Sequence, residues 1–154
     1  MSIANNERLL TGHPFFEVFN EDELRLVAFG TESVHLKAGG VLFRVDEEAD
    51  CAFLVIEGQV ELLTDDSHRL AETLGPGDLV GMLALINKDQ RRAATAIAAE
   101  PCYLLRIPRS VIYKVLEEYP EAASRIFDLI AARVKAFTRD LGPLQSELLK
   151  NVKD

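Results

Sequence analysis

Between Glu32 and Pro108 the sequence is a succession of short apolar runs, each followed by glycine, aspartate or proline. Runs of about four to eight residues rich in Val, Ile and Leu are typical of β-strands. No segment long enough for a helix separates them, so the strands are expected to pair antiparallel in a sandwich or roll. The runs are SVHLK, VLFRV, CAFLVIEG, QVELLTD, LAETLGPGD, ATAIAA and CYLLRIP.

Glycine-rich turns lie between these runs, at Gly39-Gly40, Gly58 and Gly75-Pro76-Gly77-Asp78. Glycine adopts positive φ without strain and proline fixes φ near the value that tight turns need. We therefore predict an α+β, mainly β fold. Its centre is an eight-stranded antiparallel β-roll, of the jelly-roll or double-stranded β-helix type, over residues 31–108. An N-terminal helix and two C-terminal helices flank the roll.

The N-terminal helical segment comprises residues 1–30. Asn20 followed by Glu23 is a capping-box pattern, in which each side chain accepts a hydrogen bond from the backbone of the other residue. Apolar residues then recur on one helical face. This pattern predicts a short helix that ends near Gly30.

Two helices are predicted in residues 109–154. The first ends at Tyr119-Pro120, because proline cannot continue a helix. The second is straight to about Leu141, with a kink or a separate short helix from Gly142-Pro143. Its apolar stripe either pairs two copies in a homodimer or docks the helix on its own β-roll. The stripe consists of Phe127, Ile130, Val134, Phe137, Leu141, Leu144 and Leu148.

Composition narrows the class of protein. At 154 residues, with 48% hydrophobic and 27% charged residues, the chain is typical of one globular domain with its own core. No apolar stretch reaches the roughly 18 to 20 residues of a membrane span, and the N-terminus shows no secretory signal pattern. We expect a single cytoplasmic domain, residues 1–154, without a membrane partner.

Charge and metal-ligand residues argue against two further classes. The formal net charge of −8 repels a polyanion, which argues against direct nucleic-acid binding and favours a protein or small-molecule partner. Cys51 and Cys102 lie inside apolar runs, where cysteine usually behaves as a small buried hydrophobe. No zinc-binding spacing and no Ser-His-Asp or Cys-His motif occurs, so we expect no metal, no cofactor and no enzymatic activity.

The segment from Gly77 to Thr95 carries the pattern most specific for a function. Gly81 opens one short helical turn whose free backbone N–H groups can face an anion. Arg92 follows, with small residues after it. A guanidinium offers a planar fork of donors, and alanines let backbone amides approach phosphate oxygens. We predict a small anion-binding cradle formed by Gly81, Met82, Leu83, Ala84, Arg92, Ala93 and Ala94.

With these motifs the chain resembles the cyclic-nucleotide-binding domain family, which includes the catabolite activator proteins and the regulatory subunits of protein kinase A. The resemblance covers roughly residues 15–141, through LKAGGVLFRVDEEADCAFLVIEGQVELL, the GPGD turn, and GMLAL with RRAAT. It implies that Arg92 pairs with the cyclic phosphate and that Ala93 offers its backbone amide. It also implies that Gly81 and Leu83 line the ribose side.

The sequence departs from the family pattern at two points. Where the family has a glutamate that accepts a hydrogen bond from the ribose 2′-hydroxyl, this chain has Met82, a weak acceptor. A hydrogen bond to a charged group contributes about 1.5 to 3 kcal/mol, so affinity for an ordinary cyclic nucleotide is expected to fall roughly ten- to a hundredfold. In the last helix, two base-contacting hydroxyl positions of the bacterial activators correspond to Phe137 and Thr138, so only Thr138 keeps a hydroxyl.

Two functional hypotheses follow. In the first, the chain is a signalling module that binds cAMP, cGMP or a similar phosphate ester and passes a conformational change to a partner protein or a dimer interface. In the second, it is a degenerate domain that acts as a protein–protein interaction adaptor without nucleotide. Because the sequence stops at Asp154, where a transcription activator would continue into a DNA-binding domain, output is expected to pass through a partner.

The two hypotheses assign different roles to Arg92 and Met82. If the pocket is functional, Arg92 binds the ligand phosphate. If it is degenerate, Arg92 is a surface residue or an ion-pair partner, and Met82 is a core residue that fills a vestigial pocket. The acidic residues considered as ion-pair partners for the arginine are Glu61, Asp65 and Asp66.

Overall fold

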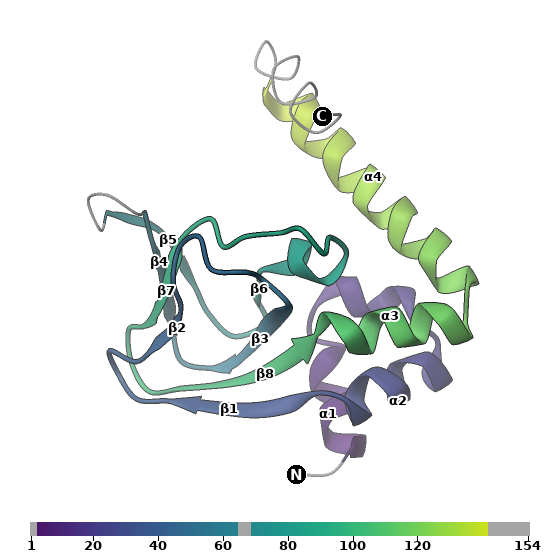
Figure 1. The fold of residues 1–154 in the computed structure, drawn as a ribbon, viewed down its shortest axis with the longest axis horizontal. Coiled ribbons are helices and arrows are strands. Elements are labelled where there is room, and N and C mark those ends of the chain that lie inside the picture. The colour runs from purple at the N-terminus through teal and green to yellow at the C-terminus, as the bar shows by residue number, and fades with distance from the viewer. Residues whose placement is uncertain (1–2, 65–68, 142–154) are drawn as a thin grey trace.

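A computed structural model describes residues 3–64 and 69–141, with only the backbone given for residue 3 and residues 133–141. It confirms the mainly β fold (Figure 1). In the described residues, eight strands form two antiparallel sheets, ordered β1-β8-β3-β6 and β2-β7-β4-β5. The strands are β1 (Glu32–Leu36), β2 (Val41–Phe43), β3 (Cys51–Glu57), β4 (Val60–Leu63), β5 (Leu70–Leu74), β6 (Leu79–Val80), β7 (Thr95–Ala98) and β8 (Cys102–Pro108).

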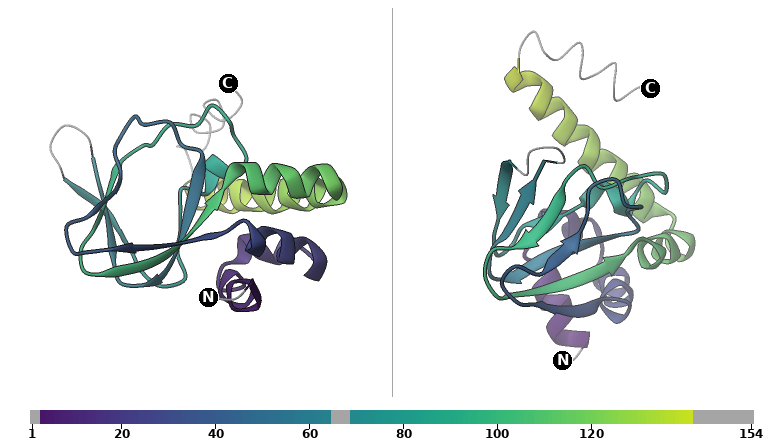
Figure 2. Two further views of the ribbon diagram at one scale, coloured as in Figure 1. Left: turned by 60° about the horizontal axis from the view of Figure 1, so that its bottom comes forward. Right: turned by 60° about the vertical axis from the view of Figure 1, so that its left-hand side comes forward.

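The helices gather at one end of the roll (Figures 1 and 2). The helix predicted from the capping box is α2, and the two predicted C-terminal helices are α3 and α4. The N-terminal segment also contains α1 and a 3-10 turn, η1, which the sequence patterns did not separate. None of the described helices has both the length and the apolar character needed to cross a bilayer. The helices are α1 (Ile3–Leu10), η1 (Pro14–Val18), α2 (Glu21–Phe29), η2 (Met82–Leu85), α3 (Arg109–Glu118) and α4 (Glu121–Leu141).

Strand β3 is buried on both faces and separates two apolar clusters. Ala52 and Leu54 pack against the helices, whereas Cys51, Phe53 and Val55 face the interior of the roll. Successive side chains of a strand point to opposite faces, so a strand between two cores must be apolar throughout. This explains why CAFLVI is an unbroken apolar run. Like the other cysteine of the chain, Cys51 is free and buried, as predicted.

Glu23 links the start of α2 to α4. The predicted capping box is present: the Glu23 N–H donates to Asn20 Oδ1, and the Asn20 N–H donates to Glu23 Oε1, both at 2.9 Å. Both carboxylate oxygens of Glu23 also accept a hydrogen bond from Arg125 Nη2, at 2.7 Å. Because Glu23 is fully buried, this ion pair holds α4 against the N-terminal helices.

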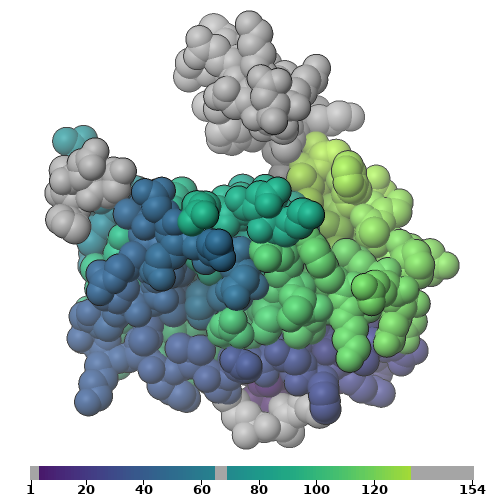
Figure 3. Space-filling model, in the orientation of Figure 1, coloured from purple at the N-terminus to yellow at the C-terminus, as the bar shows by residue number. Residues whose placement is uncertain are grey.

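The apolar stripe predicted on the last helix agrees only in part with the residues that α4 buries. Ala122 and Ile126 face inward and pack on the helical core, and Ile130 is half-buried against the same core. Phe127 is 78% exposed, so it does not dock on the β-roll. The first turns of α4 continue the surface of α3 along one flank (Figure 3). The remaining side chains of the stripe and the kink expected at Gly142-Pro143 lie outside the described residues, and the homodimer stays a prediction.

The ion pair between α2 and α4 predicts a large effect of Arg125→Ala on stability. The substitution leaves the Glu23 carboxylate buried without its cation, so we expect the free energy of unfolding in urea to fall by about 2 to 4 kcal/mol. Arg25→Ala is the control, because Arg25 pairs with Glu7 and Glu21 at the surface, where such pairs contribute less than about 1 kcal/mol. Equal losses in the two variants would contradict the assigned role of Glu23.

Candidate functional site

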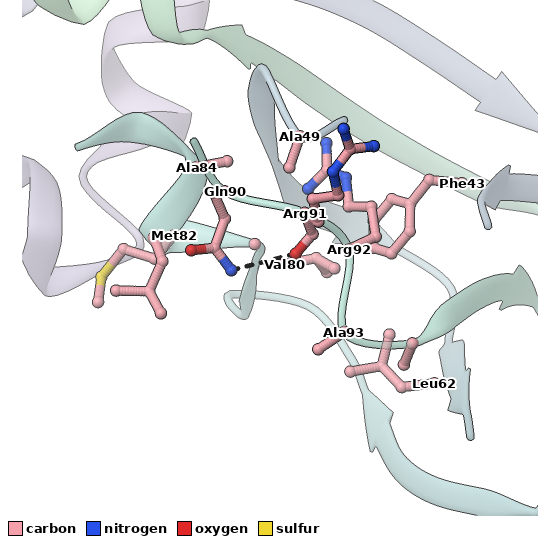
Figure 4. A pocket seen from close by; sticks show the side chains of 13 residues that line it. Phe43, Ala49, Leu62, Val80, Met82, Ala84, Gln90, Arg91, Arg92 and Ala93 are labelled. Atoms are coloured by element: carbon pink, nitrogen blue, oxygen red, sulfur yellow. Dashed lines mark hydrogen bonds between the residues drawn. The ribbon is translucent and has the colours of Figure 1, made fainter. Parts of the chain in front are cut away.

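A cavity of about 280 Å³ opens where η2 and the loop after it meet the interior of the β-roll (Figure 4). Its volume is close to the lower limit of about 300 Å³ that is usual for small-molecule pockets. The residues that line it come from β2, β4, β6, η2 and the loops before β3 and β7. They are Phe43, Ala49, Leu62, Val80, Gly81, Met82, Leu83, Ala84, Gln90, Arg91, Arg92, Ala93 and Ala94. All of the cradle residues predicted from the segment between Gly77 and Thr95 are among them.

The side chain of Arg92 is buried at this cavity, and the residue is only 6% exposed. Its Nη2 donates a hydrogen bond to the Cys51 carbonyl oxygen at 2.8 Å and lies 3.3 Å from Cys51 Sγ. The Phe43 ring packs against the guanidinium, with Cζ 4.2 Å from the ring centroid. Within the described residues, Nε and Nη1 of Arg92 have no hydrogen-bond partner although both are buried. The guanidinium is therefore anchored through Nη2, and its Nε–H and Nη1–H donors are unpaired within the described residues.

Gly81 allows the guanidinium to approach the turn that leads into η2. Its φ is +79°, a left-handed conformation that side chains with a Cβ rarely adopt. A Cβ placed on Gly81 would lie 2.5 Å from Arg92 Nη1. Arg92 thus points toward this turn and away from solvent, and the interpretation of Arg92 as a surface arginine is wrong. No ion pair joins it to Glu61 in the described residues, and residues 65–68, which include the two aspartates considered as partners, are not described.

Cys51 does not supply a negative charge to pair with the Arg92 guanidinium. Burial raises the pKa of the Cys51 thiol above its ordinary value, although the positive charge of Arg92 acts in the opposite direction. The thiol is therefore neutral near pH 7 and leaves the charge of Arg92 in place. Arg92 forms no ion pair with any described residue, so its positive charge lies beside a largely apolar wall without a carboxylate partner from this part of the chain.

The loop after Arg92 adds backbone donors to the same cavity. The backbone of Arg92 is fixed, because its N–H donates to Glu47 O at 2.9 Å and its carbonyl accepts from Asp46 N–H at 2.8 Å. The next two N–H groups, those of Ala93 and Ala94, donate no hydrogen bond within the described part of the chain. Small side chains at both positions leave these amides accessible to an anion bound by Arg92.

Met82 is half-buried and packs against the helical core. This agrees with one part of the degenerate-pocket hypothesis, which describes Met82 as a core residue. Its side chain leaves η2 on the side away from Arg92 (Figure 4). The cavity beside the guanidinium remains open, so Met82 does not fill it. Thr138 belongs to the part of α4 for which only the backbone is described, and its contact with a ligand stays a prediction.

Besides Cys51, which contacts Arg92, six residues that line the cavity were not predicted from the sequence: Phe43, Ala49, Leu62, Val80, Gln90 and Arg91. Phe43 and Cys51 belong to β2 and β3, far from Arg92 along the chain, and their contact with it depends on how the two sheets fold together. Gln90 stands two positions before Arg92, on the segment already singled out. Its polarity in a loop that opposes η2 was the one available signal.

Gly81→Ala is expected to destabilise the protein more than Gly39→Ala. Both glycines have positive φ, +79° and +85°, so both substitutions introduce backbone strain of about 1 to 2 kcal/mol. At Gly39 a Cβ meets no atom within 4 Å, whereas at Gly81 it collides with the Arg92 guanidinium. In urea unfolding we expect Gly81→Ala to lose at least about 1 kcal/mol more than Gly39→Ala. Matching losses would mean that the guanidinium does not lie against this turn.

Several known proteins resemble this chain in sequence and fold. A cyclic nucleotide-binding-like protein from Brucella abortus is 36% identical, with 73% of this chain and 98% of that chain covered and a TM-score of 0.65. The regulatory domain of PKA from Toxoplasma gondii, solved with cAMP, is 27% identical, with 73% of this chain and 44% of that chain covered and a TM-score of 0.66.

Among curated proteins, lysophospholipase nte1 from Neurospora crassa is 30% identical over 129 residues, covering 82% of this chain. Patatin-like phospholipase domain-containing protein 7 from Rattus norvegicus is 27% identical over 79% of this chain. The chain spans only 8% and 9% of the length of these two relatives. The family described as the cyclic nucleotide-binding domain matches residues 33–119, which is more than half of the chain. This chain belongs to the cyclic nucleotide-binding domain family.

Proposed function

We propose that this domain is a non-enzymatic sensor that binds a cyclic nucleotide or a similar phosphate ester at Arg92 and passes a conformational change to a partner protein or a dimer interface. The observation that carries this proposal is the buried guanidinium with Nε and Nη1 unpaired. Burying an unpaired charge is unfavourable by several kcal/mol. A bound anion would remove this penalty, because its negative charge would pair with the guanidinium.

The donors around Arg92 suit a phosphodiester. A phosphodiester group has two unbridged oxygens that share the negative charge, and charged donors such as Nε–H and Nη1–H of Arg92 form strong hydrogen bonds to such oxygens. The free amides of Ala93 and Ala94 can donate to the same oxygens. The apolar lining supplied by Phe43, Leu62 and Val80 suits the uncharged remainder of a nucleotide. The cAMP bound by the related PKA regulatory domain supports the same ligand class.

Arg109 offers a path from the pocket to the C-terminal helices. As the first residue of α3, it donates through Nη1 to the carbonyls of Ala49 at 2.8 Å and of Ala84 and Asn87 at 3.3 Å. Ala49 and Ala84 both line the cavity. A ligand that drew η2 toward Arg92 would therefore shift carbonyls to which α3 is bonded. This is the discrete contact that a population shift between two states requires.

The adaptor hypothesis remains the second candidate, and Met82 is the observation that favours it. The thioether cannot replace a carboxylate as the partner of a ribose hydroxyl. An adaptor would instead use a constant surface, and the exposed side chain of Phe127 on α4 is suited to a protein contact. In that case partner binding would be the same with and without nucleotide.

Arg92→Ala should abolish binding of cAMP and cGMP. The substitution removes two charge-assisted hydrogen bonds, which we expect to lower affinity by more than roughly a hundredfold. Isothermal titration measures the effect, with circular dichroism to verify the fold. Arg25→Ala is the matched control: Arg25 pairs with Glu7 and Glu21 at the surface, its side chain is 58% exposed, and it does not line the cavity. An absence of binding heat from the unaltered protein at millimolar ligand would end the sensor proposal.

Met82→Glu should raise the affinity for cAMP by roughly ten- to a hundredfold, because a carboxylate accepts a strong hydrogen bond from the 2′-hydroxyl. The same titration measures it, and Leu70→Glu serves as the control, since Leu70 on β5 is 50% exposed and lies outside the cavity. Binding that appears only in Met82→Glu would identify the natural pocket as degenerate and favour the adaptor. An unchanged affinity would show that the sugar does not approach residue 82.

A further inference from the structure

The pocket has no carboxylate, so a hydroxyl group of a ligand needs another partner. Among the described residues that line the cavity, Gln90 is the one whose side chain carries an oxygen. The Arg91 guanidinium is engaged elsewhere, because it donates to Asp46 O at 3.0 Å and pairs with Glu48. Arg92 can only donate and is assigned to the phosphate. By elimination, Gln90 holds the side-chain acceptor for an uncharged polar group in the pocket.

The amide of Gln90 is positioned by two hydrogen bonds but not saturated by them. Its Nε2 donates to the Arg91 carbonyl at 3.1 Å, and its Oε1 accepts from Asn87 Nδ2 at 3.4 Å. A primary amide has two N–H donors and two acceptor lone pairs, so one of each remains. Figure 4 shows the amide between Met82 on η2 and the side chain of Arg92. A ligand that extends from the guanidinium toward η2 passes this group.

We infer that Gln90 is a specificity-determining residue, which binds the sugar hydroxyl in place of the family glutamate that Met82 has replaced. This inference rests on the proposed function. In a 3′,5′-cyclic nucleotide the 2′-hydroxyl is the one free hydroxyl of the ribose, so a single amide suffices. The amide gives the site a neutral partner that can both donate and accept, whereas a carboxylate can only accept.

Neutral hydrogen bonds are weaker than charged ones, so the preference for a 2′-hydroxyl should be small. We expect the unaltered protein to bind cAMP only about two- to tenfold more tightly than 2′-deoxy-cAMP. The preference should depend on the Gln90 side chain. The backbone of the loop is held separately, by the hydrogen bond from Ala49 N–H to Gln90 O at 2.9 Å and that from Gln90 N–H to Asn87 O at 3.3 Å. Substituting the side chain should leave the loop in place.

The test is isothermal titration of cAMP and 2′-deoxy-cAMP into the full chain, Gln90→Leu and Gln59→Leu. Gln90→Leu should lower affinity for cAMP by the same two- to tenfold or so, leave 2′-deoxy-cAMP unchanged, and so abolish the preference. Gln59 is also half-buried but lies at Gly75, outside the cavity, and Gln59→Leu should keep the preference.

Loss of the preference in Gln90→Leu alone supports the inference. A preference that survives in Gln90→Leu, or an equal loss of affinity for both ligands, overturns it while leaving nucleotide binding intact. If the unaltered protein binds neither ligand, the proposed function fails and the role of Gln90 fails with it.

Discussion

The buried guanidinium of Arg92 is the interaction on which the functional end of this molecule depends. One edge of it is bonded to the Cys51 carbonyl and one face lies on Phe43, so a single side chain ties the loop before β7 to β2 and β3. Its Nε–H and Nη1–H donors are buried and have no partner within the described part of the chain. A buried charge in this condition opposes folding, and the surrounding apolar cluster and backbone hydrogen bonds must offset it. The roll therefore stabilises a charged group whose Nε–H and Nη1–H donors can accommodate a further acceptor.

Space for the Arg92 guanidinium is left by residues with small or absent side chains. No charged partner positions it among the described residues. Gly81 admits the guanidinium because it has no Cβ, and Ala93 and Ala94 leave their amides uncovered because their side chains are single methyl groups. Arg109 then fixes η2 and the loop before β3 to α3 from outside the cavity. The pocket is thus largely preformed by small residues and backbone contacts, which limits the conformational entropy that its loops and side chains lose when a ligand binds.

Much of this arrangement follows from the sequence, and the remainder depends on contacts that a sequence pattern does not encode. The apolar runs predict the strands because period and burial act locally, and the Asn20–Glu23 spacing alone specifies the start of α2. Strand β6, with only two residues, has no period to detect. The contacts of Arg92 with Phe43 and Cys51 depend on sheet register and on how the sheets fold together. The orientation of the Met82 side chain could not be predicted from the sequence either, since methionine is suited both to a core and to the wall of a pocket.

Exchange of a carboxylate for a thioether changes the electrostatics of the pocket as well as its hydrogen bonds. In a site that contains both a guanidinium and a glutamate, the two charges partly cancel, and the sugar and the phosphate share in recognition. With Met82 the positive charge of Arg92 has no anion beside it among the described lining residues. Attraction to a phosphate should then increase while discrimination between sugars weakens. The substitution shifts selectivity from the nucleoside toward the charged ester, and the neutral amide of Gln90 is suited to such a site because it adds specificity without adding charge.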